Sequence, residues 1–213
     1  MFNKVMEMKI EKFVLGSLGT NCYFITNEET KELVIVDPAT CPDYVINHVK
    51  SQGYTPKAIF LTHGHFDHVM GIEGWVKEFD IPVYLHEDEK AILMDPALNL
   101  SSAFGASYSY NKVECLKDGQ LLDVAGFTFQ IIHTPGHTAG GCCYYCETEG
   151  VLISGDTLFY QSVGRSDFPT GSMSTLVRSI KEKLFCLPDN VMVYPGHNDV
   201  TCIADEKMYN PFI

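Results

Sequence analysis

Histidine and aspartate side chains cluster in one short segment, residues 62–68, with the sequence THGHFDH. His63 and His65 lie two positions apart, and side chains with this spacing in an extended segment point to the same side. These two imidazoles can therefore share one metal ion. Asp67 and His68 follow where a helix is predicted to begin, so they turn aside and suit a second ion. Imidazole and carboxylate ligands without a thiolate are typical of zinc, iron(II), manganese or nickel sites.

Three later segments repeat one arrangement, in which a strand ends in a glycine and a possible ligand follows. The possible ligands are His137 in HTPGHT, Asp156 in SGDT and His197 in YPGH. Strand ends that gather at one edge of a sheet are where a rigid scaffold presents reactive groups. The complete predicted ligand set is His63, His65, Asp67, His68, His137, Asp156 and His197. With one shared carboxylate, this set would hold two ions and leave positions open for water.

Short apolar runs bounded by turn residues predict the strands that must position these motifs. Within the first 40 residues, which have a strand-like pattern throughout, the clearest runs are 23–25 and 33–36, and the run 58–61 leads directly into THGHFDH. Later strands are predicted near 82–85, 120–124, 127–133, 141–146, 151–155 and 191–194. Apolar residues at helical spacing predict helices over 42–52, 69–79, 87–94 and 172–185. Strands outnumber helices, which favours two packed sheets with helices outside both.

Composition limits the class of protein. The chain of 213 residues is 46% apolar and 20% charged, and no linker-like stretch divides it, so we expect one domain over 1–213. A net charge of -12 argues against a nucleic-acid partner. The N-terminal MFNKVMEMKIEKF lacks a signal-peptide core, and no apolar window is long enough to span a membrane. With eight cysteines expected to stay reduced, the protein is predicted to be cytoplasmic, its oligomeric state left open.

The order and type of these ligands resemble the metallo-β-lactamase superfamily. This resemblance implies an α/β fold, the αββα sandwich of two mixed β-sheets flanked by helices, with a metal site at one edge. It also implies two divalent metal ions, most often zinc, with iron or manganese as alternatives. By this resemblance, the ligands of the first metal are His63, His65 and His137, those of the second are Asp67, His68 and His197, and the bridge is Asp156.

Within the superfamily, the segments THGHFDH, HTPGHT, SGDTLF and YPGH resemble the hydroxyacylglutathione hydrolase (glyoxalase II) branch. The run 164–168 and the tail 210–212 are similar to those of its short single-domain members. An aspartate at 156 is unlike true β-lactamases. The chain ends soon after His197, so the helical domain that holds glutathione in glyoxalase II is expected to be absent. The resemblance implies hydrolysis of a thioester or related ester by a metal-bridging hydroxide, with Asp67 and Asp156 as catalytic residues.

A second interpretation stays open because related runs occur in the persulfide dioxygenases. Two histidines and one carboxylate form the facial arrangement of non-haem iron oxygenases. Here one iron(II) would be held by His63, His137 and Asp156, and the other ligands would support it. Metal identity and oxygen consumption distinguish this oxidoreductase from a hydrolase.

Substrate contacts are predicted in two irregular stretches that belong neither to the predicted strands and helices nor to the metal-binding motifs. Residues 95–111 show no clear period and carry Tyr108 and Tyr110, which could contact substrate or pack within the loop. Arg165 follows a glycine in a predicted loop, where it could clamp a carboxylate or pin the loop through an internal ion pair. Two carboxylates and a hydroxide do not neutralise two divalent ions, so a small anionic thioester is the expected substrate.

Other histidines and cysteines are predicted to be structural. His48 lies on the inward face of a helix and is assigned to packing or hydrogen bonding, whereas His86 is assigned to the surface. His133 could orient a ligand, but a structural role is favoured. Cys143 and Cys146 belong to a strand pattern that points them to opposite faces, so they are expected to pack rather than to bind metal.

Overall fold

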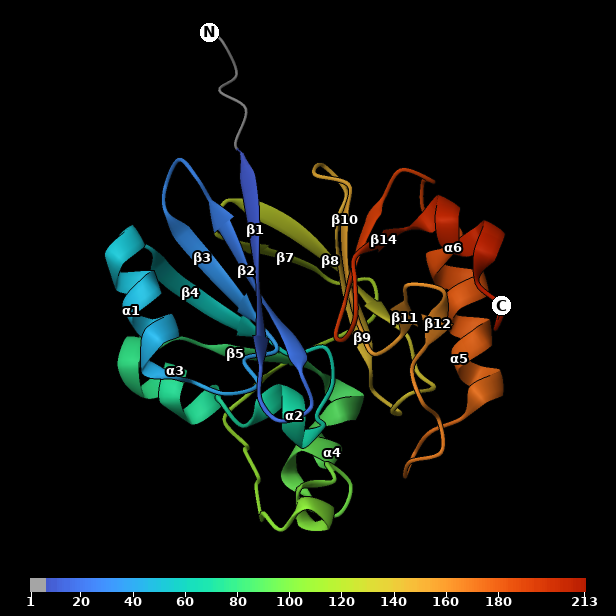
Figure 1. The fold of residues 1–213 in the computed structure, drawn as a ribbon, viewed down its shortest axis with the longest axis horizontal. Helices are drawn as coiled ribbons and strands as arrows, with labels where there is room; N and C mark the ends of the chain where they lie inside the picture. The colour runs from blue at the N-terminus through green and yellow to red at the C-terminus, as the bar shows by residue number, and fades with distance from the viewer. Residues whose placement is uncertain (1–6) are drawn as a thin grey trace, which may run out of the picture.

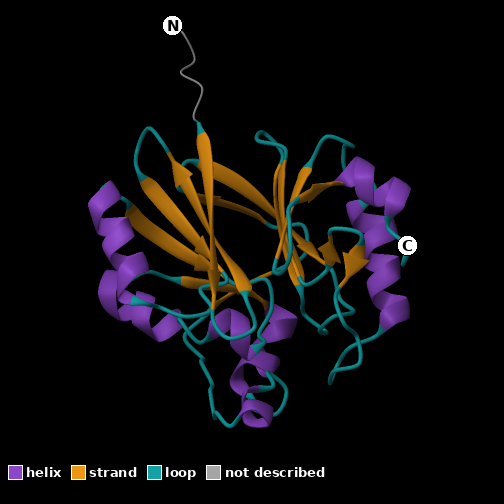
Figure 2. Cartoon of the chain, in the orientation of Figure 1, coloured by secondary structure: helices purple, strands orange, loops and turns teal. Residues whose placement is uncertain are grey.

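The computed structural model describes residues 7–213; residues 1–6, the start of the N-terminal segment considered above, lie outside the described residues. Two β-sheets pack face to face, and helices cover the outer face of each sheet (Figures 1 and 2). This is the predicted αββα architecture. None of the helices in the described part of the chain is long and apolar enough to cross a membrane.

The first sheet has six strands in chain order. Its strands are β1 (Met8–Leu15), β2 (Thr20–Asn27), β3 (Glu32–Val36), β4 (Thr55–Phe60), β5 (Val83–His86) and β6 (Glu114–Leu116). β1 to β3 pair antiparallel, while β3 to β6 pair parallel. Parallel neighbours need crossover connections, and two of these carry α1 (Asp43–Gln52) and α3 (Ile72–Phe79) onto the outer face.

The second sheet also has six strands, in the order β14-β13-β10-β9-β8-β7. Its strands are β7 (Leu121–Val124), β8 (Phe127–His133), β9 (Cys142–Cys146), β10 (Val151–Gly155), β13 (Met192–Pro195) and β14 (Thr201–Cys202). Only β10 and β13 pair parallel. The remaining elements on this side are the hairpin β11 (Leu158–Phe159) and β12 (Ser162–Val163), α5 (Met173–Ser179) with a π-helical continuation over Ile180–Leu184, and α6 (Ile203–Tyr209).

Apolar side chains form three layers that match these surfaces. Trp75 of α3 and Phe24 of β2 meet between the first sheet and its helices. Phe60 of β4 stacks on Tyr144 of β9 between the two sheets, with ring centroids 4.5 Å apart. Leu176 of α5 belongs to the layer between the second sheet and its helices. Because adjacent residues of a strand point to opposite faces, central strands such as β2 and β9 are buried along their whole length.

Three predicted helices differ in detail from the observed ones. The segment 172–185 is α-helical only to Ser179 and continues as the π-helical turn Ile180–Leu184. The segment 69–79 is divided into α2 (Phe66–Val69) and α3, and at their junction the backbone of Gly71 packs so closely that a Cβ there would lie 2.5 Å from the carbonyl oxygen of Pro38. The segment 87–94 is a 3₁₀ turn, η1 (Glu87–Glu89), followed by α4 (Lys90–Met94). Elements that the sequence did not predict include the short strands β6, β11, β12 and β14, and helix α6.

The cysteine prediction is confirmed. Cys143 packs in the layer between the second sheet and its helices, and Cys146 packs between the sheets. Both thiols are free and buried. The segment 95–111 contains one 3₁₀ turn, η2 (Ser101–Phe104), and is held by Asn99, whose side-chain amide donates to the carbonyl oxygens of Leu93 and Tyr108.

Candidate metal centre

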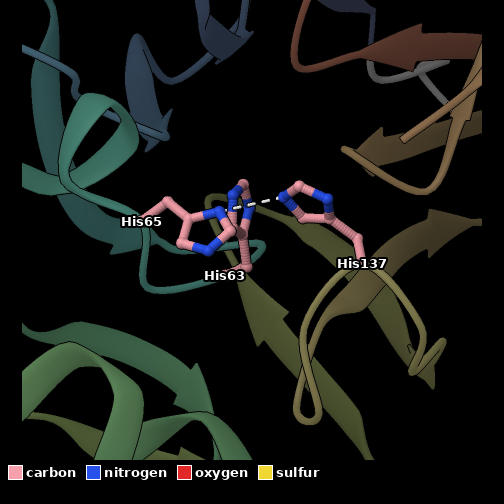
Figure 3. Close-up of side chains that lie close together, drawn as sticks. All are labelled: His63, His65 and His137. Atoms are coloured by element: carbon pink, nitrogen blue, oxygen red, sulfur yellow. Dashed lines mark hydrogen bonds between the residues drawn. The ribbon is translucent and has the colours of Figure 1, made fainter. Parts of the chain in front are cut away.

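Three buried histidines from both sheets face one another. His63 and His65 follow β4 of the first sheet, and His137 follows β8 of the second sheet; we call these three the first ligand group (Figure 3). Their ligand atoms lie within 4.8 Å of one another, and His65 Nδ1 is 2.9 Å from His137 Nε2. This spacing suits three nitrogens that surround a single ion.

A second ligand group consists of Asp67, His68 and His197, whose ligand atoms also lie within 4.8 Å of one another. Asp67 and His68 are on α2, and His197 follows β13. Asp67 Oδ2 is 3.5 Å from His68 Nε2 and 3.3 Å from His197 Nε2. The helical turn of α2 places these two side chains near His197, as the sequence predicts for a second group, while the His68 ring stays next to the first group, with its centroid 4.1 Å from that of His63.

Asp156, at the end of β10, lies between the two groups. Its carboxylate oxygens are 3.5 Å from His137 Nε2 in the first group, and 3.5 and 3.6 Å from His68 Nε2 and His197 Nε2 in the second. The structure therefore brings all seven predicted ligands together at one edge of the sandwich. A carboxylate placed between two groups of ligands can contribute one oxygen to the ion of each group.

Unpaired buried atoms test whether metal ions fit this centre. The nitrogens His63 Nε2 and His68 Nε2 and the oxygen Asp156 Oδ1 are buried and have no hydrogen-bond partner among the described residues. An unpaired buried polar atom costs about 1–3 kcal/mol, so three at one centre favour a shared partner. A set of nitrogens and carboxylate oxygens with no thiolate fits divalent zinc, iron or manganese.

The electrostatics of the two groups differ. Burial lowers the pKa of all three imidazoles of the first ligand group, which keeps them in the neutral form that binds metal. Burial acts the same way on His68, but the carboxylates of Asp67 and Asp156 outweigh it and raise its pKa to about 10. The carboxylates around the second group therefore stabilise a positive charge there, and a bound metal cation would supply that charge.

Asp37, which directly follows β3, orients one predicted ligand. Its Oδ2 lies 2.9 Å from His68 Nδ1, and the backbone N–H and hydroxyl of Thr62 donate to its two oxygens at 2.8 and 2.7 Å. With Nδ1 engaged by the carboxylate, His68 turns Nε2 toward the centre. Asp67 and His137 are held in the same way, by the hydroxyl of Thr20 and the carbonyl oxygen of Arg165.

Glu89 joins the loops that carry the first ligand group, and sequence reasoning missed it. This fully buried carboxylate accepts hydrogen bonds from the backbone N–H of Gly64 and Gly140 and from the hydroxyl of Thr138, at 2.8 to 2.9 Å. Burial raises the pKa of Glu89 to about 7, and the three donors oppose this shift. One side chain therefore fixes the loop of His63 and His65 relative to the loop of His137.

The glycines in the strand, glycine, ligand pattern permit close packing around the centre. Gly136 has a φ of +137°, and a Cβ there would lie 2.3 Å from the backbone nitrogen of Leu176. At Gly196, a Cβ would lie 2.3 Å from Asp156 Oδ1 and 2.8 Å from His68 Cε1. A side chain at Gly136 would collide with the backbone of α5, and one at Gly196 would collide with two predicted ligands, so both positions favour glycine.

A pocket of about 270 Å³ opens onto the centre. Besides the ligands, its lining is mostly apolar and comes from several separate loops and short elements. The lining residues other than predicted ligands are Leu18, Phe66, Leu100, Phe104, Phe159, Arg165 and Phe168. The pocket therefore combines a polar floor with aromatic walls.

Of the three predicted substrate contacts, only Arg165 lines this pocket. Tyr108 and Tyr110 instead pack against the outer core of the first sheet, because their segment folds back onto α3. Arg165 Nε and Nη2 donate to the two carboxylate oxygens of Asp167 at 2.9 and 2.7 Å, and its guanidinium lies 4.2 Å from the ring centroid of Phe168. The internal ion pair, one of two roles considered for Arg165, is thus present.

The remaining histidines lie apart from the seven-ligand centre. His48 Nε2 is 3.1 Å from Glu11 Oε1, which confirms hydrogen bonding. The surface assignment of His86 is wrong: it is 2% exposed because it stacks on His133, with ring centroids 4.1 Å apart and planes at 11°. Both rings approach the carboxylate of Asp88, but the nitrogens nearest to it already have backbone partners: the N–H of Asp88 donates to His86 Nδ1, and His133 Nε2 lies 2.9 Å from the carbonyl oxygen of Ala139.

Comparison with known proteins agrees with this geometry. The family model of the metallo-beta-lactamase superfamily matches residues 15–197. A probable metallo-hydrolase of Bacillus subtilis is 36% identical, over 97% of this chain and 98% of its own length. The hydroxyacylglutathione hydrolase GloC of Haemophilus influenzae is 32% identical, over 97% of this chain and 98% of its own length.

Three solved structures share the fold. The B3 metallo-beta-lactamase BLEG-1 superposes with a TM-score of 0.91 at 40% identity, covering 96% of this chain and 99% of its own. TTHA1623, solved in a di-iron-bound form, has a TM-score of 0.85 at 34% identity, covering 95% and 100%. ETHE1 from Myxococcus xanthus has a TM-score of 0.80 at 28% identity, covering 96% and 84%. With the family model matched across both sheets and the ligand pattern in place, this chain belongs to the metallo-beta-lactamase superfamily.

Proposed function

We propose that this protein is a two-metal hydrolase of thioesters. The observation that carries the proposal is the convergence of seven buried or half-buried ligands in two groups that share Asp156, with unpaired atoms in both groups. Since the second group is as complete as the first, a dinuclear centre is favoured over a mononuclear one. The relative named hydroxyacylglutathione hydrolase supports a thioester as substrate.

Two divalent ions bound here would supply Lewis acidity and lower the pKa of water at the centre toward about 7. The chain contributes position and charge. The first ligand group, neutral and buried, would hold one ion, and the second group would hold the other, with Asp156 between them. Asp67, fixed by the hydroxyl of Thr20, would also orient the attacking water. The aromatic walls of the pocket would limit other water around the reacting carbonyl.

The pocket favours a leaving group that needs no proton. Among the described residues that line it, those other than the predicted ligands are apolar or, in Arg165, permanently charged. No free general acid therefore faces the reacting bond. A thiolate, whose conjugate acid has a pKa of about 8.5, leaves without protonation far more readily than an alkoxide or an amine anion. This difference supports a thioester over an oxygen ester or an amide.

Two other activities are alternatives. The first is the persulfide dioxygenase considered from the sequence, in which one iron(II) would be held by His63, His137 and Asp156. BLEG-1 is titled a B3 metallo-beta-lactamase, so β-lactam hydrolysis is a second alternative. Thioester hydrolysis is preferred to both because the second ligand group is complete and a general acid is lacking.

One experiment separates these activities. The protein is loaded in turn with zinc, iron(II) and manganese(II), and each form is assayed with S-lactoylglutathione and acetyl thioesters, with glutathione persulfide under an oxygen electrode, and with a chromogenic cephalosporin. We expect thioester hydrolysis with close to two metal equivalents per chain. Oxygen consumption by a form with one iron, without thioester hydrolysis, would establish the dioxygenase; cephalosporin hydrolysis alone would establish the lactamase.

A further inference from the structure

We propose, building on the thioester hydrolase function, that the pocket selects an apolar acyl group, a short aliphatic chain or a phenyl-bearing chain, and leaves the thiol carrier in solvent. The first support is the chemistry of the wall. Six lining side chains carry no polar atom: Leu18, Phe66, Leu100, Phe104, Phe159 and Phe168. An acyl group that points away from the metal centre meets these side chains.

The aromatic rings surround the ligands on several sides. Phe66 and Phe104 lie with ring centroids 4.5 Å apart, on the side of the pocket formed by α2 and η2. Phe168 lies edge-on to His65 with centroids 5.6 Å apart, and Phe159 lies edge-on to His197 at 6.2 Å. A carbonyl held at the centre would therefore have hydrocarbon surface next to whatever it carries. Burial of that surface favours apolar groups over hydroxylated or charged ones.

Charge provides the second support. Arg165 is the one cationic side chain among the described residues that line the pocket, and its guanidinium is already bound at two nitrogens by Asp167. Both side chains are about two-thirds exposed, so the pair sits at the rim. A thiol carrier with several carboxylates would find no unpaired cation there besides the metal centre. Charged parts of the substrate are thus better solvated outside the pocket.

The size of the pocket and the exposure of its edge also favour a single apolar substituent. A cavity of about 270 Å³ falls just below the range of roughly 300–1,000 Å³ that holds drug-sized ligands, so it accommodates one substituent rather than a whole acylated carrier. Phe104 and Leu18 at its edge are 59% and 45% exposed. An acyl chain that covers them removes apolar surface from water, which favours binding of longer chains until the cavity is filled.

A binding experiment tests this inference without turnover. Straight-chain carboxylates, which are the acyl products, are titrated into the metal-loaded protein by calorimetry, from acetate to hexanoate. We expect affinity to rise about two- to fourfold for each added methylene. Affinity that is flat or falls along the series would overturn the inference. If this gradient is present while no thioester is hydrolysed, the hydrolase proposal fails and the apolar preference stands.

A kinetic experiment assigns the preference to the acyl side. The acyl chain is varied on one small uncharged thiol, N-acetylcysteamine, and then alkyl thiols are varied on a constant acetyl group. We expect kcat/KM to rise with acyl length and to depend little on the thiol. The opposite dependence would contradict the assignment. Phe104→Ala and Phe168→Ala should flatten the acyl dependence, whereas Phe212→Ala, which removes an exposed ring outside the pocket, should preserve it.

Asp167→Asn tests the role of charge. Wild-type protein should hydrolyse a pentanoyl thioester at least tenfold more efficiently than the succinyl thioester of similar length. Releasing the Arg165 guanidinium in Asp167→Asn should narrow this ratio, because a carboxylate in the substrate gains a cationic partner. A preference of the wild type for the succinyl substrate, or an unchanged ratio in Asp167→Asn, would overturn the inference.

Discussion

His68 shows how the folded chain orients a single predicted ligand. Its Nδ1 faces the buried carboxylate of Asp37, and its Nε2 faces Asp67 and Asp156 at 3.5 Å. A carboxylate at Nδ1 retains the proton on that nitrogen, which leaves the lone pair of Nε2 for an ion. The ligand and the residue that orients it therefore act as a pair, although only the ligand belongs to a recognisable motif.

Asp37→Asn should weaken metal binding. Asparagine tolerates the positive φ of this position, 48°, and it can still accept from the N–H of Thr62. Its amide would then donate toward His68 Nδ1, which favours the tautomer with the proton on Nε2. We expect metal affinity to fall about 10- to 100-fold, measured by competition with a chromogenic chelator. Asp43→Asn, at an exposed aspartate in α1, is the control; equal affinities in the two variants would contradict this role.

Asp156→Ala should lose more metal than His197→Ala. Asp156 approaches nitrogens of both ligand groups, whereas His197 belongs only to the second and is 22% exposed. Removing the shared carboxylate also leaves less negative charge between two cations. The metal content of each variant is measured by mass spectrometry after dialysis against a weak chelator, with Asp43→Ala as a matched control at an exposed aspartate of α1. Equal retention in Asp156→Ala and His197→Ala would show that Asp156 does not bridge.

At the scale of elements, the centre depends on loops that meet at the ends of strands from different sheets. The loops after β4 and β8 lie side by side because Glu89, on η1, accepts hydrogen bonds from both. Close packing at Gly136 brings the loop after β8 against α5. These contacts restrict the loops and so fix the positions of the predicted ligands. A metal centre binds its ion best when the donor atoms are already in position.

Glu89→Ala should destabilise the protein and weaken its metal site together. The substitution leaves two backbone N–H groups and one hydroxyl buried without a partner. At about 1–3 kcal/mol for a buried unpaired group, we expect a loss of roughly 3 kcal/mol and a lower melting temperature in calorimetry. Glu87→Ala, at an exposed glutamate of the same turn, is the control. A variant with unchanged melting temperature and metal affinity would show that Glu89 does not join the two loops.

At the scale of the whole molecule, the metal centre spans both sheets. Four predicted ligands follow β4 of the first sheet, and three follow β8, β10 and β13 of the second. Bound ions would therefore connect the two halves of the sandwich where the layer between the sheets reaches its edge. Since the halves otherwise meet mainly through apolar side chains, the ions would add a fixed connection at the reacting end.

Metal removal should lower the melting temperature. A ligand that binds only the folded state at 1,000 times its dissociation constant adds about 4 kcal/mol, which corresponds to roughly 8–16 °C for a domain of this size. We expect a shift of this order between chelated and metal-reconstituted protein in differential scanning calorimetry. The shift should be much smaller in Asp156→Ala. An equal shift in that variant would indicate that the stabilising ions bind elsewhere.

The sequence by itself determined the family, the alternation of most strands and helices, and which seven predicted ligands converge. These features are local. Each of these seven residues lies within eight positions of the end of a strand, and the apolar period of each main element is present in its own segment. The strands that escaped prediction, such as β11 and β14, have only two residues each, too few to show any period.

Tertiary structure alone decided which other residues serve the site. Asp37 meets His68 across 31 positions, and Glu89 meets Gly140 across 51, so no local pattern marks either contact. Tyr108 packs against the outer core of the first sheet, and Arg165 forms an ion pair with Asp167. Both side chains are therefore engaged within the folded chain. The physical reason is that a side chain's type fixes which chemistry it can perform, whereas its neighbours, set by packing of distant segments, fix whether it is free to perform it.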